Sequence, residues 1–163
     1  MDSNLLGRLL IDVVEDDDEE GVLRLAEILI NDGAYINPPN PRANFTALLG
    51  AVQRGYVPLA KMLIEKGAII NGIKGFNHGE TLLMIAVKRG SLDLVKLLVE
   101  KGSDVNEVAS CFCTALSTAR GKGNKEIEGY LVSLGAVVIC PKISNDGSWH
   151  CTLPEGHEGE CKY

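Results

Sequence analysis

The chain has 163 residues, of which 45% are hydrophobic, 23% are charged and 5% are aromatic, and its formal net charge is −6. The length allows one domain with an aliphatic core, and the acidic balance argues against a general nucleic-acid binder, which would carry a basic surface. No apolar run approaches the length of a membrane-spanning helix, so we expect no membrane span. The odd number of Cys residues does not resemble a secreted disulfide framework, which favours a reducing, cytoplasmic location.

Two helices are predicted near the start of the chain. Leucine and valine recur there at helical spacing, at Leu5, Leu6, Leu9, Leu10, Val13 and Val14. The segment "GVLRLAEILINDG" (21–33) has the same periodicity, and the acidic run "EDDDEE" (15–20) lies between the two. The run lacks the alternating ligands and central Gly of a calcium loop, so we interpret it as a long solvent-exposed turn.

One phrase recurs along the chain. It reads "INDGAYIN" (30–37), "IEKGAIIN" (64–71) and "VEKGSDVN" (99–106), with "VSLGAVVI" (132–139) as a degenerate fourth copy. The glycines of the four copies, Gly33, Gly67, Gly102 and Gly135, are 33 to 35 residues apart. Each is expected to end a helix in the left-handed conformation, where a Cβ would be unfavourable.

A shorter helix is predicted upstream of each later copy. Segments 46–55, 81–90 and 114–123 begin with Thr46, Thr81 and Thr114, and threonine is a good helix N-cap. The chain thus divides into four units of paired helices, at about 4–37, 38–71, 72–106 and 107–139. One such pair cannot bury its apolar face alone, so we predict an all-α solenoid whose stacked pairs share a core.

The pattern resembles the ankyrin repeat, with its G-x-T-P-L-H-x-A opening and its G-A-D-V-N closing phrase. Residues 79–106, "GETLLMIAVKRGSLDLVKLLVEKGSDVN", follow it almost position by position, and the resemblance covers roughly residues 4 to 139. It implies an ankyrin-repeat domain over 1–139, with hairpin-like loops, that binds a protein partner. The Pro and His of T-P-L-H are absent, which leaves open whether the hydrogen bonds of that His are replaced.

The fourth unit departs from the pattern at its outer helix. The apolar pair Leu94-Val95 of the third unit becomes Ile127-Glu128. A charge at a position where the next repeat would dock predicts that the stack ends here, or that something other than a repeat covers it.

The resemblance implies that partners bind on the concave side, through the inner helices and the loops. By repeat register, the outward positions of the inner helices are Gln53, Arg54, Lys88, Arg89 and Lys122, of which four are basic. One interpretation is a groove for an acidic protein segment, and the other is that these are solvated helix ends where cations suit the helix dipole. The variable loops add Arg42, Phe45, Phe76 and His78 as partner-binding candidates, although the aromatic rings can equally pack on their own loops.

The C-terminal segment 140–163 has few apolar residues and several metal-binding side chains. Cys140, Cys151, His157 and Cys161 have the spacing C-x10-C-x5-H-x3-C, with His150 as an alternate ligand, which suits a structural zinc site. Disorder and a disulfide that joins two of these Cys residues are the alternatives. The phrase "CTLPEGHEGEC" (151–161) resembles a short element at the ends of some bacterial proteins.

We therefore expect a monomeric, cytoplasmic protein-interaction scaffold whose C-terminal segment caps the stack. The cofactor we expect is one structural zinc ion, which this segment would hold. A second hypothesis is a bacterial effector or adaptor that acts inside a host cell. A third is a metal- or thiol-dependent enzyme that uses the C-terminal segment. The sequence contains no Gly-rich phosphate loop, nucleophile elbow or HExxH pair, so we do not expect an enzyme.

Overall fold

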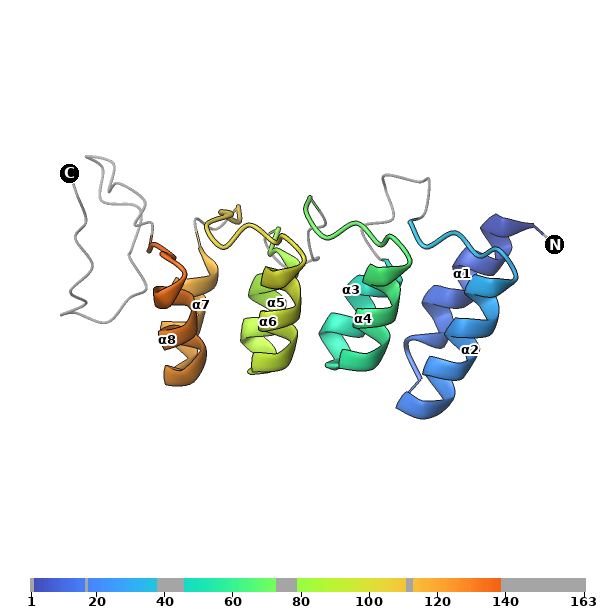
Figure 1. Ribbon diagram of the computed structural model, residues 1–163, viewed down its shortest axis with the longest axis horizontal. Coiled ribbons are helices and arrows are strands. Elements are labelled where there is room, and N and C mark those ends of the chain that lie inside the picture. Colours follow the sequence, from blue (N-terminus) through green and yellow to red (C-terminus); the bar gives the residue numbers. More distant parts are fainter. Residues whose placement is uncertain (1, 17, 38–45, 73–78, 111–112, 139–163) are drawn as a thin grey trace.

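The computed structural model describes residues 2–16, 18–37, 46–72, 79–110 and 113–138. This part of the chain forms four antiparallel helix pairs that stack side by side (Figure 1). The helices are α1 (Ser3–Val13), α2 (Glu19–Asn31), α3 (Ala47–Arg54), α4 (Val57–Glu65), α5 (Leu82–Arg89), α6 (Leu92–Glu100), α7 (Ala115–Lys122) and α8 (Lys125–Ser133). The predicted all-α repeat fold is confirmed.

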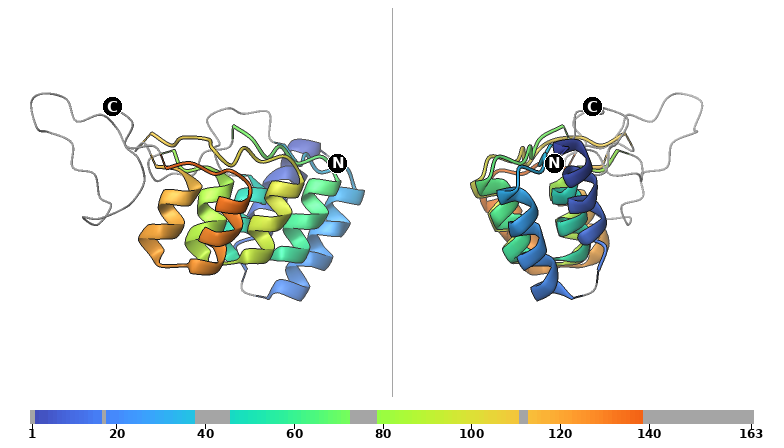
Figure 2. Two further views of the ribbon diagram at one scale, coloured as in Figure 1. Left: turned by 60° about the vertical axis from the view of Figure 1, so that its left-hand side comes forward. Right: turned by 90° about the vertical axis from the view of Figure 1, so that its right-hand side faces the viewer.

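The helices form two layers, which Figure 2 shows end-on. The inner helices α1, α3, α5 and α7 contact one another in sequence, and so do the outer helices α2, α4, α6 and α8. Aliphatic side chains from both layers, such as Leu49, Leu63, Leu83 and Leu98, are fully buried in one continuous core. Because each pair shares its core with its neighbours, the pairs stabilise one another.

The helix boundaries follow the predicted signals. The Thr46, Thr81 and Thr114 hydroxyls accept hydrogen bonds from backbone N–H groups in the first turns of α3, α5 and α7, which confirms the predicted N-caps. The chain leaves α2 through Gly33 with φ +93° and leaves α4 through Gly67 with φ +94°. Only glycine adopts this conformation without strain, so the repeated glycine phrase marks where the outer helices end.

The turn between the paired helices is longer in the first repeat than in the other three. Two residues join α3 to α4, α5 to α6 and α7 to α8, whereas residues 14–18 separate α1 from α2. The acidic run therefore lengthens this turn, as predicted, although its last two residues, Glu19 and Glu20, belong to the first turn of α2.

In two of the repeats, an apolar side chain occupies the position where the ankyrin pattern has histidine. Leu49 in α3 is fully buried and Met84 in α5 is 1% exposed. In α7 the position is Ser117, whose hydroxyl accepts the Thr114 N–H at 2.8 Å while the Thr114 hydroxyl accepts the Ser117 N–H at 3.2 Å. Core packing in α3 and α5 and the reciprocal cap in α7 thus take the place of the hydrogen bonds that histidine makes in the ankyrin pattern.

Candidate functional site

Asparagine side chains join each repeat to the next at the loop end of the helices. The Asn37 side chain donates to the Gly67 carbonyl and accepts the Ile69 N–H, both at 2.9 Å. Asn71 repeats the arrangement one unit later, with the Gly102 carbonyl at 2.9 Å and the Asp104 N–H at 3.4 Å. These bonds fix the spacing of neighbouring loops.

The third asparagine makes the last of these links. Asn106 accepts the Val137 N–H at 2.8 Å. The degenerate fourth copy of the phrase ends in Ile139, so the asparagine that makes these links is absent at that position of the sequence. We call these three side chains, Asn37, Asn71 and Asn106, the asparagine clamps.

A second row of hydrogen bonds joins the repeats at the opposite end of the inner helices. Arg54 donates to the Glu15 carbonyl after α1, and Arg89 donates to the Arg54 carbonyl at 2.7 Å. The Tyr56 hydroxyl donates to the Asp16 carbonyl at 2.8 Å. The two guanidinium groups, which were interpreted either as partner-binding cations or as solvated helix ends, therefore satisfy carbonyls at the ends of the preceding helices.

The side chains of α3 and α5 that are accessible to solvent lie in the last turns of these helices. Gln53 is half-buried and Lys88 is exposed, whereas residues 47–52 and 82–87 are buried. The Lys88 ammonium forms an ion pair with the buried carboxylate of Glu80. Lys122 in α7 is exposed, and no ion pair within the described residues involves it. We call the solvent-accessible surface of α3, α5 and α7 the inner-helix face.

Several candidates from the sequence lie outside the described residues. These are the loop residues Arg42, Phe45, Phe76 and His78 and the proposed zinc ligands Cys140, His150, Cys151, His157 and Cys161. Among the residues that the structure does describe, no three His, Cys, Asp or Glu side chains are placed to hold a metal ion. No helix in that same part of the chain is long and apolar enough to cross a membrane.

Glu128 forms ion pairs within its own repeat. Its carboxylate accepts hydrogen bonds from Lys125 and from Arg120, both at 2.9 Å. The Lys125 bond and, to a lesser extent, the Arg120 bond lower the pKa of Glu128 from its ordinary value of 4.5, against the opposing effect of partial burial. The charge that breaks the repeat pattern is thus compensated without a following repeat.

Replacing Glu128 with Gln is expected to lower the free energy of unfolding at pH 7 by about 0.5 to 1 kcal/mol, because the ion pairs are partly in water. The folded-state pKa lies below the unfolded value, so this contribution is present above pH 4.5 and is lost as the pH falls through the lower, folded-state pKa. Urea unfolding of both proteins over a pH series measures the difference. A difference that grows toward acid pH would contradict this assignment.

Comparison with known proteins agrees with the repeated geometry. The sequence matches none of the curated proteins with which it was compared. A family model that describes three copies of the ankyrin repeat matches residues 10–109, more than half of the chain. Proteins built from these repeats are typically non-enzymatic scaffolds that bind other proteins. The chain therefore belongs to the ankyrin-repeat family and has the architecture of a protein-interaction scaffold.

Proposed function

We propose that the inner-helix face binds a segment of a protein partner and that this face is rigid before the partner arrives. The observation that carries the proposal is the pair of hydrogen-bond rows, with the asparagine clamps at the loop end and the Arg54 and Arg89 bonds at the turn end. The asparagine clamps link all four repeats at the loop end and the arginine bonds link the first three at the turn end, so these contacts oppose sliding of the inner helices past one another. A preorganised surface loses little conformational entropy on binding, which favours affinity.

We further propose that the partner segment is acidic. Lys88, Arg89 and Lys122 are exposed along this face, and Arg54 lies beside them at the turn end. Lys88 is paired with Glu80 and the two arginines cap carbonyls, so these three are poor sites for testing charge without disturbing the fold. Gln53 and Lys122 avoid this difficulty. Positive potential along a groove mainly raises the rate of encounter with an acidic segment.

The double variant Gln53→Glu/Lys122→Glu is expected to capture at least tenfold less partner protein than the wild type does. The matched control, Lys61→Glu/Lys101→Gln, makes the same change in net charge at exposed residues in and after the outer helices. Quantitative affinity capture with the three purified proteins compares them. Equal retention of partners by both variants would contradict the acidic-segment proposal, and equal loss would show that only overall charge matters.

We also propose that segment 140–163 caps the end of the stack. The proposal is supported by three exposed apolar side chains near this end, Val132, Leu134 and Val137, which a cap would cover. In addition, the buried Thr114 hydroxyl donates to the Val137 carbonyl at 3.0 Å, which holds the chain to the fourth repeat just before the segment begins. Solenoids need such covers because the outer face of a terminal repeat is otherwise in water.

In this proposal, Cys140, Cys151, His157 and Cys161 hold one structural zinc ion, with His150 as the alternate ligand. Metal analysis of the purified protein is expected to find one zinc per chain, lost in Cys151→Ser and in His157→Ala. Absence of stoichiometric zinc would favour a disulfide or a disordered segment. The effector and enzyme hypotheses rest on this segment alone and stay predictions.

A further inference from the structure

The first repeat exposes a face that the other three repeats bury. Leu25, Leu59, Leu94 and Ile127 occupy the same register position, eight residues before the repeated glycine. Leu59, Leu94 and Ile127 are 0% exposed, whereas Leu25 is 50% exposed. Each of the three buried residues lies on an outer helix that contacts the preceding outer helix, and α2 has no preceding helix pair in the described chain.

A second register position shows the same difference in exposure between the first repeat and the other three. Met62, Leu97 and Tyr130 are partly buried against the core, whereas their counterpart Ile28 is 56% exposed. Leu25 and Ile28 lie one turn apart and form an apolar stripe along α2. The side of α2 that faces away from the stack is therefore built like a helix-docking surface.

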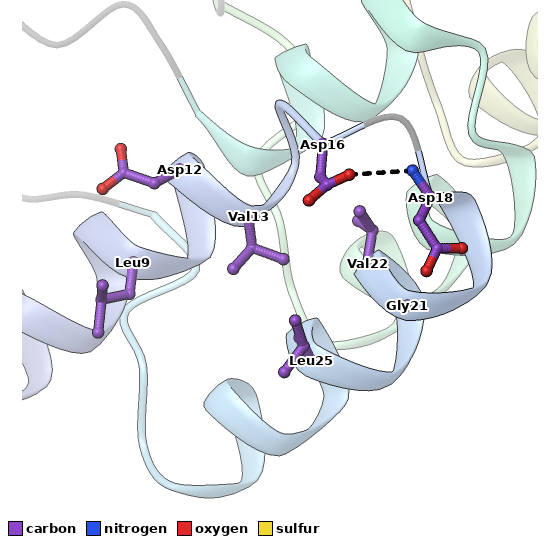
Figure 3. A pocket seen from close by; sticks show the side chains of 8 residues that line it. All are labelled: Leu9, Asp12, Val13, Asp16, Asp18, Gly21, Val22 and Leu25. Atoms are coloured by element: carbon purple, nitrogen blue, oxygen red, sulfur yellow. Dashed lines mark hydrogen bonds between the residues drawn. The ribbon is translucent and has the colours of Figure 1, made fainter.

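The inner helix of the first repeat adds a parallel apolar stripe. Leu6 and Leu10 point into the core, while Leu5 and Leu9 are exposed. Between the two helices lies a hollow of about 370 Å³, whose apolar lining is Leu9, Val13, Val22 and Leu25. In Figure 3 the apolar side chains of the two helices converge on it, and Asp16 and Asp18 lie at its turn end. We call this surface the N-terminal groove.

The rim of the N-terminal groove is acidic. Asp12, Asp16 and Asp18 line it, and no ion pair within the described residues involves any of them. The Asp16 carboxylate accepts the Asp18 N–H at 3.1 Å. Residues 1–37 contain ten Asp and Glu but only two Arg and no Lys, a formal charge of −8, whereas the whole chain carries −6. The negative charge of the protein is thus concentrated in its first repeat.

We propose that the N-terminal groove binds a basic amphipathic helix of another protein, at a site separate from the inner-helix face. The occupant is helical because the equivalent side chains of later repeats pack against helices. It is apolar on one face, which covers Leu5, Leu9, Leu25 and Ile28, and basic on its flanks, which face the unpaired carboxylates. Paired apolar anchors and a complementary rim are the usual features of helix-in-groove recognition.

A labelled synthetic peptide of about 14 residues, roughly four helical turns, with leucine on one face and lysine on its flanks serves as the probe. Fluorescence anisotropy is expected to detect its binding to the full chain, and a peptide with glutamate in place of lysine is expected not to bind. The variant Leu9→Ser/Leu25→Ser is expected to weaken binding at least tenfold. The control Ile69→Ser removes an exposed apolar residue outside the N-terminal groove and is expected to leave binding unchanged.

Charge at the rim is tested separately. Asp12→Asn/Asp16→Asn is expected to weaken binding and to reduce its salt dependence, whereas Glu65→Gln/Glu100→Gln, the same change on exposed residues of α4 and α6, is not. Equal weakening by the rim and control variants would overturn the proposal, because it would mean non-specific attraction to an acidic protein. Self-association in sedimentation velocity that Leu9→Ser/Leu25→Ser abolishes would also overturn it, with a second copy of the chain as the occupant.

Discussion

Replacing Leu94 with Ala is expected to lower the free energy of unfolding by about 3 kcal/mol, within the usual range of about 2 to 5 kcal/mol for this change in a core. Leu94 is fully buried in the middle of the stack, so the truncated side chain leaves a cavity that neighbouring repeats cannot close. Urea unfolding followed by circular dichroism measures the loss.

Leu25→Ala is the matched control, because it makes the same change at the same register position. Half of the Leu25 side chain is already in water, so the expected loss is below about 1 kcal/mol. Similar losses for the two variants would contradict the open N-terminal face and would mean that Leu25 is covered in solution.

Asn71→Ala is expected to cost about 1 to 2 kcal/mol, although Asn71 is an exposed loop residue. The substitution removes two hydrogen bonds to the following repeat, and each neutral bond contributes about 0.5 to 1.5 kcal/mol. Substitutions of exposed residues usually change stability by less than about 0.5 kcal/mol, so a loss of this size would be distinctive.

Asn31→Ala provides the control, since Asn31 is an exposed asparagine at the end of α2 whose side chain makes no hydrogen bond with the described residues. Its stability is expected to match that of the wild type within about 0.5 kcal/mol. Hydrogen exchange adds a local readout, because Asn71→Ala is expected to release protection in the loop around Asp104 in particular. Unchanged protection there would show that the clamp does not hold the loop.

Local signals in the sequence predicted most of the fold. Threonine caps and left-handed glycines act within one or two turns of chain, so Thr46 or Gly67 can be interpreted without knowledge of distant residues. The apolar stripe of the first helix was also visible. The sequence did not indicate which residues of this stripe are buried, because Leu6 and Leu5 differ only in what lies beside them once the repeats stack.

The contacts between repeats were not predicted. The recurring asparagine was part of the repeated phrase, but its partners lie about 30 residues away and are backbone atoms, which leave no pattern in a sequence. Arg54 and Arg89 were assigned to partner binding from their outward register. The register gives the direction of a side chain but not the carbonyl that stacking brings within its reach.

Site-specific photo-crosslinking tests the central claim, which is that a partner binds along the inner-helix face. A photoreactive residue is placed at Gln53 or Lys122 on that face, and at Lys61 or Glu100, which are exposed on the outer helices. Irradiation in the presence of captured partner proteins is expected to give strong crosslinks from the two inner positions and weak ones from the two outer positions. Crosslinks of equal strength from both layers, or stronger crosslinks from the outer helices, would contradict the account.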